Sequence, residues 1–327
     1  MLKENSRILV TGGAGFIGSN LCEALMNLGH IVTCLDNFST GRKKNIESFV
    51  GHDNFHLIEG DIRDLNTCKS AVENQDFVLH QAALGSVPRS IDNPINTNSV
   101  NIDGFLNMLV ASKEANIQRF IYAASSSTYG DSSALPKVEE VIGNPLSPYA
   151  VTKLVNEQYA RVFHQLYGLN VVGLRYFNVF GRRQDPEGAY AAVIPKFART
   201  LITGGTVQIN GDGTNTRDFT YIENVIQANL LCLSTPNVEV IGEVFNVAGG
   251  ERTSLVEMVK MMREHLGALN IEISDSQIQY GPQRVGDIPH SWASIEKAKK
   301  MMGYEPQFNF YNGLKAAVQW YHDEYKR

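Results

Sequence analysis

Short apolar runs and longer helical stretches alternate through the first half of the chain. Five runs of four or five residues, rich in β-branched and aromatic side chains, lie at residues 7–10, 31–35, 55–59, 77–80 and 120–123. Such runs are typical of strands that are buried on both faces, and intervening helices favour parallel pairing. The pattern predicts a doubly wound α/β fold, in which a parallel sheet carries helices on both faces.

Helices are expected at 16–28, 98–114 and 148–167, and a sixth strand at 171–176. The start of the third helix is the best defined, because Ser147 is a good N-cap and Pro148 suits the first helical position. Tyr149 and Lys153 follow on this helix, four residues apart, and therefore share one of its faces.

The second half of the chain has a different pattern. Shorter elements are separated by clusters of Gly, Asp, Thr and Asn, and we expect helices at 194–202, 222–233, 254–266 and 311–325 and a strand at 243–247. A chain of 327 residues exceeds the usual size of a single core. We therefore predict a domain at residues 1–180 and a smaller mixed α/β lobe at 181–327, from which some strands and helices return to the first domain.

The bulk composition narrows the class of protein. A net charge of −5 argues against a nucleic-acid partner, and no apolar run approaches the length of about 18 residues that crosses a membrane. The first residues show no apolar signal core, so we expect a cytoplasmic protein. The four cysteines lack a C-x-x-C pair and are expected to be reduced, and no metal site is expected.

A glycine-rich turn follows the first strand and opens the first helix. The spacing Gly12-x-x-Gly15-x-x-Gly18 allows a tight turn and close backbone approach to a pyrophosphate, which the helix N-terminus attracts. Asp36 ends the second strand, where a carboxylate binds both ribose hydroxyls and repels a 2′-phosphate. NAD is therefore favoured over NADP, although the basic residues at 42–44 leave a 2′-phosphate contact open.

The ends of the later strands meet the same edge of the predicted sheet, where such folds bind their ligands. Asp61 follows the third strand and either contacts an adenine or caps the next helix. Ser125 ends the fifth strand, where its hydroxyl is placed to bond a reacting sugar oxygen. Tyr149 acts as a base near pH 7 only if its phenolate is favoured by roughly 4 kcal/mol. Lys153, the positive charge of an oxidised nicotinamide and the helix N-terminus together are expected to supply this stabilisation of the phenolate.

These motifs together resemble the extended short-chain dehydrogenase/reductase family. Within it, the stretches 81–90, 124–130 and 175–181 resemble bacterial UDP-N-acetylglucosamine 4-epimerases of surface-polysaccharide pathways, including lipopolysaccharide biosynthesis. The resemblance implies a Rossmann-type fold with NAD and a UDP-sugar. It also implies reversible C4 epimerisation of UDP-N-acetylglucosamine to UDP-N-acetylgalactosamine. In this reaction Tyr149 takes the 4-hydroxyl proton while NAD takes the C4 hydride. The bound 4-keto sugar then rotates and receives the hydride on its other face. A homodimer through the helices at 98–114 and 148–167 is implied as well.

The family's site residues are carried over to matching positions of this sequence. The catalytic residues implied are Ser125, Tyr149 and Lys153. The implied cofactor contacts are Gly12, Gly15, Phe16, Ile17, Gly18, Asp36, Asn37, Ser39, Thr40, Gly41, Asp61, Ile62, Gln81, Ala82, Ala83, Asn101, Tyr149, Lys153, Tyr176 and Val179. The implied substrate contacts are Ser86, Ser125, Ser126, Ser127, Tyr149, Asn178, Ala192, Val193, Gln208, Asn210, Arg217, Arg284, Asp287 and Ser291.

Several rival functions remain. Related dehydratases and decarboxylases place an acid just after the active-site Ser or Thr, but here Ser126 and Ser127 follow Ser125, which argues against C5 chemistry.

Ser291 replaces a bulky tyrosine of the hexose-restricted enzymes and leaves room for an N-acetyl group. A UDP-N-acetylglucosaminuronic acid 4-epimerase and a UDP-glucose 4-epimerase are the alternatives. A non-catalytic NAD-sensing protein is more remote, because it does not need Ser125, Tyr149 and Lys153 together.

Overall fold

A seven-stranded parallel sheet forms the centre of the protein. The computed structural model describes residues 2–187, 191–269, 277–282 and 290–325. The strand order is β11-β6-β5-β4-β1-β2-β3, and each neighbouring pair is parallel. The order reverses after β3, since β4 returns to the other side of β1. The predicted doubly wound fold is confirmed.

Each element has the following bounds. The strands are β1 Arg7–Thr11, β2 Ile31–Asp36, β3 Phe55–Glu59, β4 Phe77–His80, β5 Arg119–Ser125, β6 Val171–Tyr176, β7 Val179–Phe180, β8 Val207–Asn210, β9 Thr216–Arg217, β10 Thr220–Tyr221, β11 Val244–Val247, β12 Thr253–Ser254 and β13 Ile278–Gly281. The α-helices are α1 Phe16–Asn27, α2 Leu65–Val72, α3 Val87–Asp92, α4 Pro94–Asn98, α5 Gly104–Glu114, α6 Pro148–Tyr167, α7 Val193–Ile202, α8 Ile222–Ser234, α9 Leu255–Gly267, α11 Glu296–Met302 and α12 Phe310–Tyr325. The short 3-10 and π segments are η1 Lys43–Asn45, η2 Ser99–Asp103, η3 Ser126–Tyr129 and η4 Val238–Val240.

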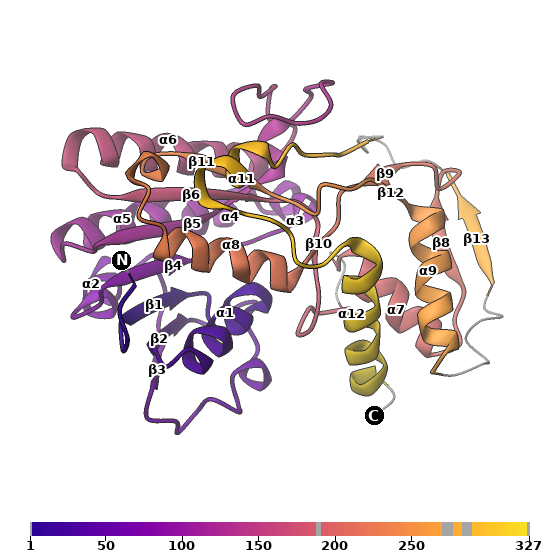
Figure 1. Ribbon diagram of the computed structural model, residues 1–327, viewed down its shortest axis with the longest axis horizontal. Helices are drawn as coiled ribbons and strands as arrows, with labels where there is room; N and C mark the ends of the chain where they lie inside the picture. Colours follow the sequence, from indigo (N-terminus) through magenta and orange to yellow (C-terminus); the bar gives the residue numbers. More distant parts are fainter. Residues whose placement is uncertain (1, 188–190, 270–276, 283–289, 326–327) are drawn as a thin grey trace.

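The two faces of the sheet bury separate apolar clusters. On β1, Ile8 and Val10 belong to the cluster that α1 and α8 cover, while Leu9 between them belongs to the cluster under α2, α5 and α6. Side chains that alternate along a strand point to opposite faces, so a continuous apolar run serves both layers. This is why the strands read as unbroken apolar runs in the sequence. Figure 1 shows α5 and α6 on one side of the sheet and α1 and α8 on the other.

The helix expected at 98–114 begins earlier than the sequence predicts. The helical path starts at Pro94 in α4, passes through the π-helical η2 and continues in α5. Asn93 caps it, because its side chain accepts a hydrogen bond from the Asn96 N–H at 3.1 Å. The pattern of apolar residues did not predict this earlier start, because α4 is mostly exposed and polar.

A strand from the second half of the chain completes the large sheet. β11 pairs in parallel with β6, and Val244 lies opposite Gly173. The segments at the right of Figure 1 form a smaller lobe, in which α12 packs on α7 and α9 beside the β8–β13 pair, whereas α8 and α11 pack on the large sheet. No helix among the described residues is long and apolar enough to span a membrane.

Candidate active site

The glycine-rich turn lies between β1 and α1 and has no room for side chains. Gly12 has a φ of +67°, and a Cβ there would lie 2.8 Å from the Ala82 nitrogen. A Cβ on Gly18 would lie 2.1 Å from the Gly12 carbonyl oxygen. Gly15 is the N-cap of α1, so the first N–H groups of this helix face the turn. These contacts explain why glycines recur here and why a phosphate group has direct access to the backbone.

A pocket opens at this turn, along the carboxyl ends of the first four strands. Most of the predicted cofactor residues line it, namely Gly12, Gly15, Phe16, Ile17, Gly18, Asp36, Asn37, Ser39, Thr40, Asp61, Ile62, Gln81, Ala82 and Ala83. The sequence reasoning did not assign five further lining residues, Leu35, Gly60, Leu84, Gly85 and Val100. Each of these five lies next to an assigned position in the chain, and Leu35 and Gly60 also lie within one residue of a strand end.

Asp36 lies at the end of β2, at the floor of this pocket. Its carboxylate accepts hydrogen bonds from the Ala14 and Phe38 N–H groups at 2.9 and 2.8 Å. Burial raises the pKa of Asp36 above its usual value, and the two backbone bonds oppose this rise. Gly41 does not line the pocket, but a Cβ on it would lie 2.7 Å from an Asp36 oxygen. Gly41 therefore lets the loop close over the carboxylate.

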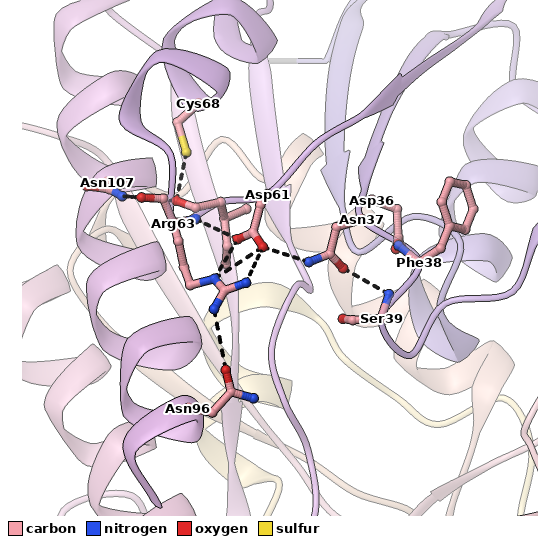
Figure 2. Close-up of polar contacts among 10 residues, drawn as sticks. Asp36, Asn37, Phe38, Ser39, Asp61, Arg63, Cys68, Asn96 and Asn107 are labelled. Carbon is pink, nitrogen blue, oxygen red and sulfur yellow. Dashed lines mark hydrogen bonds and ion pairs between the residues drawn. The ribbon is translucent and has the colours of Figure 1, made fainter. Parts of the chain in front are cut away.

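Asp61 is the centre of a polar network at one end of the pocket, which Figure 2 shows. It forms an ion pair with Arg63 at 2.6 Å and accepts a hydrogen bond from the Asn37 side chain at 2.9 Å. These contacts, chiefly the Arg63 bond, lower the pKa of Asp61 to about 2. The alternative role of Asp61 as a helix cap is wrong, because Asp64 caps α2 through the N–H groups of Asn66 and Thr67.

These residues fit a dinucleotide with a free 2′-hydroxyl. At the glycine turn the backbone segments lie so close that a Cβ on Gly12 or Gly18 would collide with backbone. The Asp36 carboxylate lines the pocket, where its charge would repel a 2′-phosphate. The basic residues that left NADP open are engaged elsewhere: Arg42 pairs with Asp185, Lys43 with Glu59 and Lys44 with Glu324.

Two further predicted cofactor residues, Asn101 and Tyr176, support the pocket from outside. Asn101 exchanges hydrogen bonds with the backbone of Leu84 and donates to the Thr152 hydroxyl at 3.1 Å. Tyr176 donates to the Gln81 side chain at 3.2 Å, which orients a pocket residue. Val179 lies in β7, which pairs with β10.

The Ser125 and Tyr149 side chains meet beside this pocket. Ser125 ends β5, and its Oγ accepts a hydrogen bond from the Ser127 N–H at 3.1 Å, which leaves its own proton to donate. Tyr149 lies in the first turn of α6, which Ser147 caps through the Ala150 N–H at 3.1 Å. Burial raises the pKa of the half-buried Tyr149, and a hydrogen bond with Ser125 opposes this rise. Ser126 and Ser127 follow in η3.

Lys153 lies one helical turn beyond Tyr149 and is buried. Its ammonium donates to the Ala123 carbonyl at 2.8 Å and lies 6.0 Å from the centre of the Tyr149 ring. Burial lowers the pKa of Lys153 to about 8. The sequence argument expected Lys153 and the helix N-terminus to favour the phenolate, but the chain by itself raises the pKa of Tyr149. Burial of the phenol is the largest cause of this rise.

The predicted substrate residues come from several distant segments. Ser86 caps α3 with an unusual φ of +99°. Asn178 donates to the Asp218 carbonyl at 2.9 Å, so its amide does tie down its loop. Gln208 and Asn210 point from the exposed face of β8. Ala192 and Val193 begin α7.

Arg217 and Ser291 are brought together by backbone pairing. The Ser291 N–H donates to the carbonyl of Thr216, the neighbour of Arg217, at 3.0 Å. Arg217 itself donates to the same carbonyl at 2.9 Å. The predicted contacts Arg284 and Asp287 lie outside the described residues.

Comparisons with known proteins agree with this geometry. The model of the NAD dependent epimerase/dehydratase family matches residues 8–248. A UDP-glucose 4-epimerase of Mycolicibacterium smegmatis is 33% identical over 97% of this chain and 99% of its own length. The structure of a UDP-N-acetylglucosamine 4-epimerase from Methanobrevibacter ruminantium, in complex with UDP-N-acetylmuramic acid, has a TM-score of 0.91 at 36% identity, over 98% of this chain and 100% of that chain.

A third similar protein was solved with both kinds of ligand. It is a UDP-glucuronic acid 4-epimerase from Bacillus cereus in complex with UDP-glucuronic acid and NAD, with a TM-score of 0.88 at 32% identity, over 98% of this chain and 100% of that chain. The chain therefore belongs to the NAD dependent epimerase/dehydratase family and is an enzyme with NAD as its cofactor.

Proposed function

We propose that this enzyme is an isomerase that interconverts UDP-N-acetylglucosamine and UDP-N-acetylgalactosamine by inverting C4. One arrangement carries the proposal: Ser125 ends β5, Tyr149 lies in the first turn of α6 where the Ser125 side chain lowers its pKa against burial, and Lys153 lies one turn behind. This is the arrangement that proton transfer at a sugar hydroxyl requires, because base, orienting donor and supporting cation come from rigid elements.

Each catalytic side chain has a separate task in this reaction. Tyr149 accepts the proton of the 4-hydroxyl and later returns it. Ser125 donates to the same oxygen, since its Oγ already accepts from Ser127. Lys153 supports the phenolate through its charge. When bound, NAD supplies the acceptor and then the donor of the C4 hydride.

The residues after Ser125 argue for chemistry at C4 alone. Neither Ser126 nor Ser127 is an acid or base that works on C5, and both lie in η3 directly beyond β5. A dehydratase or a decarboxylase needs such a group near that carbon. We therefore favour epimerisation over these related reactions.

The N-acetylated substrate is supported by Ser291 and by one relative. The Ser291 side chain is small and half-buried, and its backbone is fixed to the segment of Arg217. A solved structure that is 36% identical to this chain is named a UDP-N-acetylglucosamine 4-epimerase. We propose that the product serves the synthesis of a surface polysaccharide.

A uronic acid is the second candidate substrate. The similar enzyme from Bacillus cereus was solved with UDP-glucuronic acid, and the serine hydroxyls at 125–127 are suitable donors to a C6 carboxylate. Among the uronic acids, UDP-N-acetylglucosaminuronic acid has an N-acetyl group that would occupy the space at Ser291. UDP-glucose remains a third candidate.

We also propose a division of labour along the chain and a homodimer. Residues 1–180 would bind NAD and carry the catalytic groups, while 181–327 would bind the UDP-sugar and contribute β11 and α8 to the sheet. The outer face of α6 exposes Val151, Val162, Leu166 and Tyr167 at 42–70%. Such a row of apolar side chains supports pairing of α5 and α6 with a second copy.

The test of the proposed activity uses purified enzyme without added NAD. It is incubated separately with UDP-N-acetylglucosamine, UDP-glucose and the two corresponding uronic acids, and the C4 epimers are separated by chromatography. We expect fastest turnover of UDP-N-acetylglucosamine. Faster turnover of a uronic acid would favour the second candidate.

A Tyr149→Phe variant is the control for the mechanism. It removes the phenol with little change of shape, so turnover should fall by a factor on the order of 10²–10⁴, while NAD binding, followed by fluorescence, persists. Turnover equal to that of the parent enzyme would contradict the role of Tyr149. Absence of turnover with all four sugars would favour an NAD-sensing protein.

A further inference from the structure

A buried ion pair lies behind the catalytic helix. Glu157 is on α6, one turn beyond Lys153, and Arg175 is on β6. Nε and Nη2 of Arg175 donate to the two Glu157 oxygens at 2.9 and 2.8 Å, and the side chains are only 5% and 7% exposed. Such fully buried pairs add little net stability compared with apolar residues. The two parallel hydrogen bonds instead fix the position of the carboxylate.

Arg175 is held from two more directions. Its Nη1 donates to the Glu139 carbonyl at 3.0 Å, and its guanidinium lies 4.8 Å from the centre of the Tyr129 ring. Tyr129 ends the short turn η3, which begins directly after Ser125. The ion pair therefore connects the helix of Tyr149 and Lys153 with the turn of Ser125.

The titratable and polar groups around Lys153 come from four elements. α6 supplies Tyr149 and Glu157, and β5 supplies the Ala123 carbonyl that accepts from the ammonium at 2.8 Å. β6 supplies Arg175, whose charge Glu157 neutralises. β4 supplies His80, and burial lowers the pKa of this imidazole to about 3, so it carries no charge at neutral pH. Burial lowers the pKa of Lys153, and the Glu157 carboxylate opposes that effect.

Glu157 and Arg175 have no place in the glycine-turn pocket. They line a second, polar cavity, together with residues of α6, β11 and α11, and the two cavities share none of their described lining residues. We propose that Glu157, clamped by Arg175 one helical turn beyond Lys153, is a positioning residue that keeps the Lys153 ammonium charged for proton transfer at Tyr149. The consequence for turnover rests on the proposed function, whereas the effect on Lys153 does not.

A direct titration of Lys153 tests the inference without any substrate. The full-length protein is labelled with [ε-¹³C]lysine, the Lys153 signal is assigned with a Lys153→Met variant, and its chemical shift is followed against pH. In the parent protein the midpoint should lie near pH 8. In Glu157→Gln, which keeps the shape but loses the charge, the midpoint should move by about one pH unit toward acid.

Glu139→Gln is the matched control. Glu139 is also a buried carboxylate of this network and accepts from the Asn246 N–H at 2.8 Å, but it does not act on Lys153. The Lys153 midpoint should stay in place in this variant. An unchanged midpoint in Glu157→Gln, or an equal shift in both variants, overturns the inference.

Turnover gives a second readout. Because the charged form of Lys153 supports the phenolate, the alkaline limb of the kcat profile should move toward acid in Glu157→Gln by the same amount as the titration midpoint. A double variant, Glu157→Gln with Arg175→Gln, leaves no unpaired buried charge; because it removes two opposite charges, the Lys153 midpoint should move in the same direction as in Glu157→Gln but by less. A fall in kcat at every pH with no displaced limb would show a merely structural role.

Discussion

Single side chains of the site are oriented by contacts within the chain. The Ser125 hydroxyl accepts from the Ser127 N–H, the Lys153 ammonium donates to the Ala123 carbonyl, and the Ser291 backbone is bonded to Thr216. Each bond restricts the rotamers or the local backbone, so the groups are arranged before the reaction starts. Substitutions at these positions should therefore change one step of the reaction, or the preference for one substrate, and leave the fold intact.

Ser291→Tyr tests substrate choice at this scale. The larger side chain should fill the space that we assign to an N-acetyl group. We expect kcat/KM to fall much more for UDP-N-acetylglucosamine than for UDP-glucose, by about tenfold or more in the ratio. Steady-state kinetics on both sugars measure this ratio, and equal losses on both would refute the assigned role of Ser291.

At the scale of elements, the start of α6 sets the position of Tyr149. The Ser147 hydroxyl accepts from the Ala150 N–H and Pro148 occupies the first turn, so the helix begins at a fixed residue. Tyr149 follows two positions after the cap. Fraying of this turn would move the phenol away from Ser125.

Ser147→Ala and Ser254→Ala form a matched pair of cap variants. Ser254 caps α9 through the Glu257 N–H at 3.2 Å, in the lobe away from Ser125 and Tyr149. Each variant should lower the free energy of unfolding by about 1 kcal/mol in denaturant titrations. Only Ser147→Ala should also lower kcat, by about tenfold. A similar fall in kcat for both variants would contradict a local effect on Tyr149.

For the whole molecule, Asp218 joins segments that are far apart in the sequence. Its carboxylate accepts from the N–H groups of Gly249 and Ala293 at 2.9 and 3.2 Å, and its own carbonyl accepts from Asn178. These segments lead to β11 of the large sheet, to β9, which carries Arg217, and to the segment of Ser291. The buried aspartate thus links the sheet to the smaller lobe.

Asp218 should make the stability of the protein depend on pH. Burial raises its pKa to about 7, against the backbone bonds that lower it. Because the folded state holds this proton more tightly than the unfolded chain, whose aspartates titrate near 3.9, the contribution is full below about pH 4 and is lost as the pH rises through 7. The parent protein should therefore lose more unfolding free energy between pH 5 and pH 8 than an Asp218→Asn variant, measured by urea titration. Equal pH dependence of the two proteins would show that Asp218 is not the responsible group.

The sequence alone determined the features that depend on neighbouring residues. The six strands of the first half were predicted within two residues at each end, because buried strands require continuous apolar runs and α/β units repeat them. The glycine turn was predictable from its spacing, and the need for Gly18 is local, because a Cβ there would collide with the Gly12 carbonyl of the same turn. The start of α6 followed from Ser147 and Pro148.

Only the tertiary structure decided which distant groups meet. Asp61 and Asp64 both precede α2, but Asp64 caps it, while Asp61 is bound by its neighbour Arg63 and, across the sheet edge, by Asn37. The packing of α6 against β5 directs the Lys153 ammonium toward the Ala123 carbonyl. The burial that raises the pKa of Tyr149 likewise exists only in the folded chain. Local propensity and turn chemistry act over a few residues, whereas burial and charge contacts are set by the order of strands in the sheet.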